Sequence, residues 1–208
     1  MCFVKHRGFE SRFICIILMS QHLVKQVFLN HKKYIQQIFP TTLGYLINKE
    51  LFLLIPSNKI EKFLHFLKNH THTQYKSLSD ISGTDYPFKK TRFEVSYNLL
   101  SVTYNVRVNI LSVSDELVSV NSITPVYKCS NWFERESWDM LGVFFYGNKD
   151  LRRILTDYGF KGHPLRKDFP VTGYIEVRYD ELQKRIITEK VSFAQDFRDF
   201  VANKNWLE

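Results

Sequence analysis

Glu134 and Glu136 are the acidic residues whose spacing first suggests chemistry, because a general acid and a general base are often a pair of carboxyl groups. The residues around them predict a helix, in which two positions differ by about 200° around the axis. The two carboxylates would therefore face opposite sides of the helix and could not flank one substrate. We expect no catalytic carboxylate pair at this position.

Metal binding is a second chemistry to consider, through His65, His70 and His72. These residues fall at the polar end of a predicted helix and in the loop after it, and no cysteine or carboxylate lies at the spacing of a metal site. The eight glycines form neither a dinucleotide fingerprint nor a phosphate-binding loop. We therefore expect no metal-binding residues and no nucleotide-binding residues.

The cysteines Cys2, Cys15 and Cys129 are dispersed and include no Cys-x-x-Cys pair. This usage is typical of a reducing compartment, and it leaves one thiolate too few for an ordinary iron–sulfur cluster. No nucleophile has a general base at a recognisable spacing. By elimination, the sequence indicates a binding or scaffolding protein without a cofactor, and any electron carriers would belong to partners.

The charged residues of the segment that begins at Trp132 suggest a polar network. Arg135 and Asp139 are four residues apart, so they are expected to pair along one face of a helix. Glu136 shares a face with Asp139, and these two like charges require a cation from elsewhere, for which Arg152 or Arg153 is available. Beside tryptophan, such a network is expected to be partly buried and to fix one docking geometry.

The net charge of +8 comes from residues 1–100, which carry 14 Lys+Arg against 6 Asp+Glu. A basic, aromatic-rich half could bind nucleic acid, and a nucleic-acid-binding organellar protein is the alternative hypothesis. A solvated surface is the simpler interpretation. Alanine occurs only at Ala194 and Ala202, whereas Phe, Ile, Asn and Lys are abundant, which is typical of an AT-rich genome such as that of an organelle.

Apolar periodicity predicts helices and antiparallel-type strands within one domain. This arrangement indicates an α+β fold, a two-layer domain with helices on one face of a mixed or antiparallel sheet. The expected order is a helix over 20–39, two short strands within 44–55, a helix over 57–69, strands over 75–82, 92–100 and 104–113, and a helix over 132–141.

The helix over 132–141 carries signals at both of its ends. Asn131 is the expected N-cap, with Glu134 completing a capping pair, and Gly142 lies just past the C-terminal end. Asn148 is expected to cap a further short helix that runs through Leu155.

The chain is expected to comprise a leader or extension of unknown role over 1–19, a core domain over 20–146 that ends in the capped helix, and an extended partner-binding tail over 147–208. The longest apolar run, Phe13–Met19, is too short to span a membrane. Within the tail, alternation predicts a strand over 175–180, and a capped helix is expected from Ser192 onward. Apolar residues after 159 are expected to bind a partner in extended form.

Several segments resemble the family of the 30-kilodalton subunit of respiratory complex I, the proton-pumping NADH:ubiquinone oxidoreductase, in its mitochondrial type. The resemblance covers about residues 60–200, and the block from Glu134 to Asp180 is highly specific. The matching segments are Arg92–Ser101, Trp132–Phe145, Asp150–Phe160, Gly162–Pro170 and Gly173–Asp180.

The resemblance implies a structural subunit of the peripheral arm, on the matrix side of the mitochondrial inner membrane and attached to the membrane through the complex. Flavin and iron–sulfur clusters would lie on partners, among them the large quinone-site subunit and the iron–sulfur subunits. No residue of this chain is expected to be catalytic. The predicted interface and signature residues are Glu134, Arg135, Glu136, Asp139, Arg152, Arg153, Asp157, His163, Arg166, Lys167 and Asp168.

The sequence departs from the family pattern at Asn148-Lys149, where members usually have His-Pro. Any role of that histidine is therefore open in this chain. Residues 1–40 match the family only loosely.

Overall fold

The computed structural model describes residues 26, 28–47, 50–193, 195 and 198. The chain divides into two compact units, Met1–Lys167 and Asp168–Glu208. The predicted leader over 1–19 lies outside the described residues. Of the helix predicted from Ser192 onward, residues 192, 193, 195 and 198 are described and are not helical, and the others lie outside the described residues.

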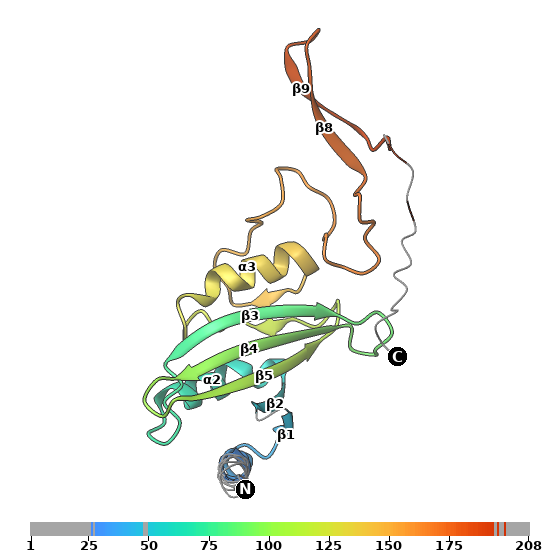
Figure 1. The fold of residues 1–208 in the computed structure, drawn as a ribbon. Helices are drawn as coiled ribbons and strands as arrows, with labels where there is room; N and C mark the ends of the chain where they lie inside the picture. The colour runs from blue at the N-terminus through green and yellow to red at the C-terminus, as the bar shows by residue number, and fades with distance from the viewer. Residues whose placement is uncertain (1–25, 27, 48–49, 194, 196–197, 199–208) are drawn as a thin grey trace, which may run out of the picture. The chain divides into compact units, whose positions relative to one another are not determined.

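The first unit is built on a five-stranded sheet with the order β1-β2-β5-β4-β3 (Figure 1). All neighbouring strands are antiparallel except β2 and β5, which are parallel. Residues 28–38 form a helix that ends before Pro40, as predicted. The elements that follow are β1 (Leu43–Ile47), β2 (Glu50–Pro56), a 3₁₀ turn (Ser57–Lys59), α2 (Ile60–Asn69), β3 (Ser77–Asp85), β4 (Phe93–Ser101) and β5 (Val106–Ser114).

One face of this sheet forms the core. In β4, every second residue from Phe93 to Ser101 is buried, and the residues between them are partly exposed. The buried side of α2, which includes Phe63 and Leu67, joins the same core, as does Leu141 near the end of the next helix. The predicted α+β fold, with helices on one face of a mixed sheet, is confirmed.

The chain continues through β6 (Val120–Asn121) into α3 (Ser130–Leu141) and then β7 (Phe145–Tyr146), which pairs in parallel with β6. The C-terminal end of α3 is as predicted, because Gly142 adopts a left-handed φ of 79° and its N–H donates to the carbonyl of Trp138. The predicted N-cap is wrong. The helix begins at Ser130, with Cys129 at the cap position and no side-chain capping bond.

Residues 147–167 form loops and turns, and the short helix expected to end at Leu155 is not formed. Asn148 instead closes a turn, since its Oδ1 accepts a hydrogen bond from the N–H of Asp150 at 3.0 Å. This segment belongs to the first unit, so the boundary between the units falls after Lys167, later than the start expected for the tail.

The second unit contains a hairpin of β8 (Ile175–Asp180) and β9 (Arg185–Lys190). The strand β8 was predicted from its alternation, and β9 was not predicted. Among the described residues, no helix is long and apolar enough to cross a membrane.

Candidate functional site

Asp139 on α3 is the centre of the polar network in the first unit. Its side chain has no exposed surface. One carboxylate oxygen, Oδ2, accepts backbone hydrogen bonds from Ile154, Leu155 and Thr156 at 3.1, 2.8 and 2.9 Å. The other, Oδ1, accepts from Arg153 Nη1 at 2.9 Å and from the Thr156 hydroxyl at 2.7 Å. The loop after β7 is therefore wrapped around one buried carboxylate.

These donors determine the ionisation of Asp139. Burial by itself would raise the pKa of the carboxyl group, but the hydrogen bonds from Thr156, Leu155 and Arg153 outweigh burial and hold its pKa well below the usual range. Asp139 is consequently a carboxylate throughout the physiological pH range, and its acceptor positions are already used within the chain. It is suited to fixing a fold and unsuited to exchanging protons.

The loop also completes the C-terminal end of α3. A helix leaves its last carbonyls without intrahelical partners, and here the carbonyls of residues 139–141 are reached by later residues. The Nδ1 of His163 donates to the carbonyl of Asp139 at 3.0 Å. The N–H of Leu165 donates to the carbonyl of Met140 at 3.0 Å, and the Nε of Arg166 donates to that of Leu141 at 2.7 Å. Residues far along the chain thus cap the helix.

This capping requires a glycine at position 142. A Cβ there would lie 2.6 Å from Arg166 Nη2 and 2.7 Å from His163 Nε2, in addition to the strain of the left-handed backbone. Burial lowers the pKa of His163, which favours the neutral imidazole and its Nδ1–H donor. The absence of a side chain at Gly142 therefore leaves the space in which His163 and Arg166 cap α3.

A second buried carboxylate, that of Asp85 at the end of β3, binds the C-terminal end of the same loop. Arg92 binds it in a bidentate manner, with distances of 2.8 and 3.0 Å, and the backbone N–H of Lys167 donates to it at 2.9 Å. The hydrogen bonds from Arg92 lower the pKa of Asp85. Arg92 and Arg166 also share the carboxylate of Glu116, at 2.7 and 3.3 Å. The role of Asp85 was not predicted from the sequence, since an acidic residue at the end of a strand is usually exposed.

Glu134 has a different role from the predicted capping pair. Its side chain is fully buried, and it accepts hydrogen bonds from Ser122 Oγ at 2.7 Å, the Ile123 N–H at 2.8 Å, Thr124 Oγ1 at 3.4 Å and Asn148 Nδ2 at 2.8 Å. The helix therefore turns Glu134 inward to fix the loop after β6. Asn148, one of the two residues at which the sequence departs from the pattern of the resemblance, is a neutral donor to this carboxylate.

The predicted pairing of Arg135 with Asp139 is wrong. Arg135 donates from Nε to the carbonyl of Arg152 at 3.3 Å, and its guanidinium lies 5.0 Å from the ring centroid of Trp132. Among the described residues, no ion pair joins it to Asp139. Arg152 and Arg153 were the two arginines expected to supply a cation, and it is Arg153 that pairs with Asp139. Arg152 instead pairs with the exposed Asp150 at 3.1 Å.

Two of the other predicted residues, Glu136 and Asp157, contribute no side chain to these clusters. Glu136 is exposed on α3. Asp157 closes a turn, with its Oδ1 accepting from the N–H of Tyr158 at 2.8 Å. The side chains of Lys167 and Asp168 are exposed, and Asp168 begins the second unit.

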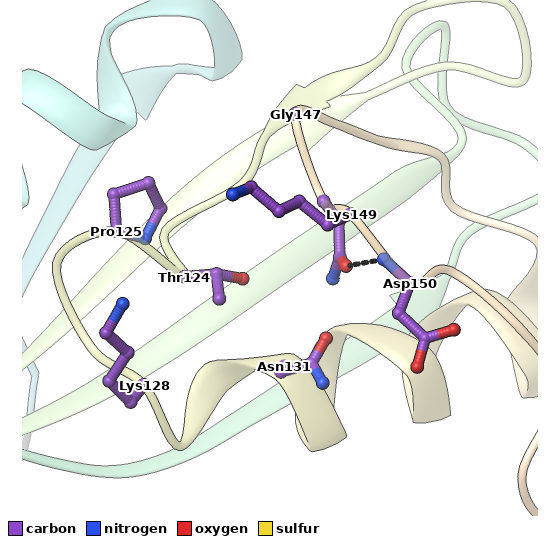
Figure 2. Close-up of a pocket in the computed structure, with 8 residues that line it drawn as sticks. Thr124, Pro125, Lys128, Asn131, Gly147, Lys149 and Asp150 are labelled. Carbon is purple, nitrogen blue, oxygen red and sulfur yellow. Dashed lines mark hydrogen bonds between the residues drawn. The ribbon is translucent and has the colours of Figure 1, made fainter.

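A cavity of about 410 Å³ lies beside the start of α3, between Lys128 and Lys149 (Figure 2). Within the described part of the chain, no group of three or more His, Cys, Asp or Glu side chains could hold a metal ion. The candidate site therefore consists of buried carboxylates whose acceptor positions are filled, together with a cavity beside α3 that is lined by two lysines.

Comparisons with known proteins identify the family. A family model described as the respiratory-chain NADH dehydrogenase 30 Kd subunit matches residues 53–175. The chain is 49% identical over 180 residues to the NADH-ubiquinone oxidoreductase subunit 9 of Prototheca wickerhamii, covering 85% of this chain and 93% of that one. It is 51% identical over 168 residues to the mitochondrial NADH-ubiquinone oxidoreductase 30.4 kDa subunit of Neurospora crassa, covering 81% and 57% respectively.

A solved structure is similar in fold. The match is to a chain of the membrane-bound sulfane sulfur reductase, an archaeal respiratory membrane complex, with a TM-score of 0.59 and 25% identity. It covers 68% of this chain and 84% of that one. These similarities give no support to a nucleic-acid-binding protein. The chain belongs to the family of the 30 kDa subunit of respiratory-chain NADH dehydrogenase.

Proposed function

We propose that this chain is a non-catalytic structural subunit in the peripheral arm of mitochondrial complex I, on the matrix side of the inner membrane. There it supports electron transfer from NADH to ubiquinone, which the complex couples to proton translocation. Membership of the family supports the place in complex I. The observation that carries the non-catalytic role is that the two oxygens of Asp139 accept five hydrogen bonds from the chain's own loop.

The acid–base properties of the site support a structural role. A general acid or base works best with a pKa near the working pH and with access to substrate. Asp139 and Asp85 have lowered pKa values and are almost completely buried. Their charges instead hold the loop over 150–167 against α3 and the end of β3. Flavin and iron–sulfur clusters accordingly belong to neighbouring subunits, as does the quinone site.

The hairpin of the second unit supports attachment to those neighbours. Its register places Ile175, Val177 and Tyr179 of β8 on one face, with Ile186 of β9 opposite Tyr179. Each of these four side chains is more than half exposed. A hairpin of two strands is marginally stable alone, so a receiving surface on the large quinone-site subunit or an iron–sulfur subunit would stabilise it.

The assay for this function is native electrophoresis of detergent-solubilised mitochondrial membranes. The chain should migrate with the band that oxidises NADH, and its deletion should remove that band. Restoring the chain should restore assembly. Migration of the chain at its own mass of 24.8 kDa, with the NADH-oxidising band intact after deletion, would overturn the proposal.

A further inference from the structure

The cavity beside α3 brings together two lysines from separate parts of the chain. Lys128 lies just before α3 and Lys149 lies after β7, and Figure 2 shows their side chains on either side of Thr124. The amide side chains of Asn131 and Asn148 also line the hollow. The lining thus includes four side chains that can donate hydrogen bonds.

The two ammonium groups lack counter-charges within the part of the chain that the structure describes, where neither takes part in an ion pair. Asp150 also lines the cavity, and its carboxylate and that of Glu134 have partners other than the two lysines. Asp150 pairs with Arg152 at 3.1 Å. Glu134 is fully buried and accepts hydrogen bonds from Thr124 and Asn148. The cavity is therefore lined by two ammonium groups that form no ion pair with the described residues.

The size of the cavity indicates the kind of anion that fits. Its volume of about 410 Å³ is within the range of sites that enclose organic groups, and it is many times the roughly 30 Å³ of a water molecule. An inorganic anion would leave most of this space unfilled. The side chain of Asp or Glu, together with the backbone that carries it, would occupy more of it.

An exposed tryptophan follows the cavity-lining residue Asn131 in the sequence of α3. Trp132 follows Asn131 on the first turn of α3, is 63% exposed, and stacks against the guanidinium of Arg135 at 5.0 Å. Tryptophan and arginine are enriched among the residues that dominate binding energy at protein interfaces. The combination of this indole with two unmatched lysines fits an acidic protein segment.

Building on the proposed function as a subunit of a larger assembly, we propose that the cavity between Lys128 and Lys149 receives an Asp or Glu side chain of a neighbouring subunit. The ammonium groups bind its carboxylate, and Trp132 packs against the segment that carries it. Charge-assisted hydrogen bonds of this kind are shorter and stronger than neutral ones.

The direct test is carbodiimide cross-linking of the intact purified complex, because carbodiimide joins an amine to a carboxylate that it already contacts. Mass spectrometry should find Lys128 or Lys149 joined to an Asp or Glu of another subunit. The exposed Lys62 of α2 is the control for chance contacts. Modification of both lysines by an amine reagent to the same extent in the complex and in the free chain would overturn the inference. Protection without a cross-link to a protein carboxylate would also overturn it, and would indicate a different anion.

Charge reversal provides an independent measurement. The Lys128→Glu, Lys149→Glu double variant should bind the complex lacking this subunit at least about 30-fold more weakly, the low end of the loss of a buried charged contact. Lys62→Glu should bind normally. Unchanged affinity of the double variant would contradict the inference, whereas failure of the unmodified chain to enter the complex would contradict the proposed function instead.

Discussion

Asp139 shows how a single residue can determine the path of a loop. Its carboxylate gathers the N–H groups of three consecutive residues, 154–156, and the guanidinium of Arg153. None of these donors is a near neighbour of Asp139 in sequence. The local rule that pairs residues four apart on a helix therefore gave the wrong partner, Arg135, because a surface rule cannot anticipate a loop that returns to cover the helix.

The Asp139→Asn variant should lower the free energy of unfolding by about 3–5 kcal/mol, since it leaves the Arg153 charge and several donors poorly matched. The pKa of Asp139 is lower in the folded state, so its stabilisation is fully present above the unfolded pKa of about 3.9 and is lost as the pH falls below it. Denaturant titrations from pH 7 to pH 2 should show a steeper acid loss for the unmodified chain than for the variant. Glu136→Gln, which changes an exposed acid on the same helix, is the control.

Arg153 and Arg152 provide a matched pair of neighbouring arginines. Arg153→Ala removes the cation from a fully buried carboxylate and should cost about 3 kcal/mol or more of stability. Arg152→Ala breaks only an exposed pair with Asp150 and should cost about 0–1 kcal/mol. Urea unfolding of both variants measures the difference. Equal losses would mean that the buried carboxylate is compensated by the backbone donors alone.

At the scale of elements, the sequence predicted what depends on local periodicity. The alternation of β4 and the apolar side of α2 were both visible, and both are buried as expected. The partner of β8 was not predicted. Arg185–Lys190 contains the β-branched residues Ile186, Ile187 and Thr188, but the two adjacent isoleucines break the alternation of apolar and polar residues that identifies a half-buried strand. Glu134 was assigned to a cap because its spacing from Asn131 fits one, whereas tertiary contacts with residues 122–124 turn it inward.

The junction of α3 with its distant cap can be tested with two glycines that both have left-handed backbones. Alanine at either position has a conformational cost of about 1–2 kcal/mol. At Gly147, φ is 88° and nothing lies near the added Cβ, so Gly147→Ala should show little beyond that cost. Gly142→Ala should lose about 1–3 kcal/mol more, because the methyl group displaces His163 and Arg166 from the helix carbonyls. Thermal unfolding compares them, and equal losses would argue against the cap.

The hairpin should behave differently in the free chain and in the complex. Burial of Ile175, Val177, Tyr179 and Ile186 on a neighbour would contribute on the order of 10 kcal/mol. Trypsin should therefore cut the free chain after residues of the second unit, such as Lys184 and Arg185, and should spare them in the assembled complex. Equal protection in the free chain would show that the hairpin needs no partner.

At the scale of the whole molecule, buried and exposed groups have different roles. The buried carboxylates Asp139, Asp85 and Glu134 are satisfied within the chain. The lysines beside the cavity and the exposed apolar residues of the hairpin are the groups that we propose contact other subunits. In the function that we propose, the buried carboxylates stabilise the fold and the exposed groups contact neighbouring subunits. This division of roles is expected of a subunit that positions neighbouring subunits in an assembly.

The same division predicts the spectroscopic properties of the purified chain. Because the cysteines are dispersed in the sequence and the buried carboxylates of Asp85 and Asp139 are already bound by arginines and backbone donors, we expect neither a flavin nor a cluster on this chain. Purified alone under anaerobic conditions, it should show no absorbance between about 350 and 500 nm, where flavins and iron–sulfur clusters absorb through their own chemistry and not that of the protein. The complex from which it is taken should keep that absorbance. Stoichiometric iron or flavin that remains with the isolated chain after gel filtration would contradict a purely structural role, and would direct attention to the residues outside the described part of the chain.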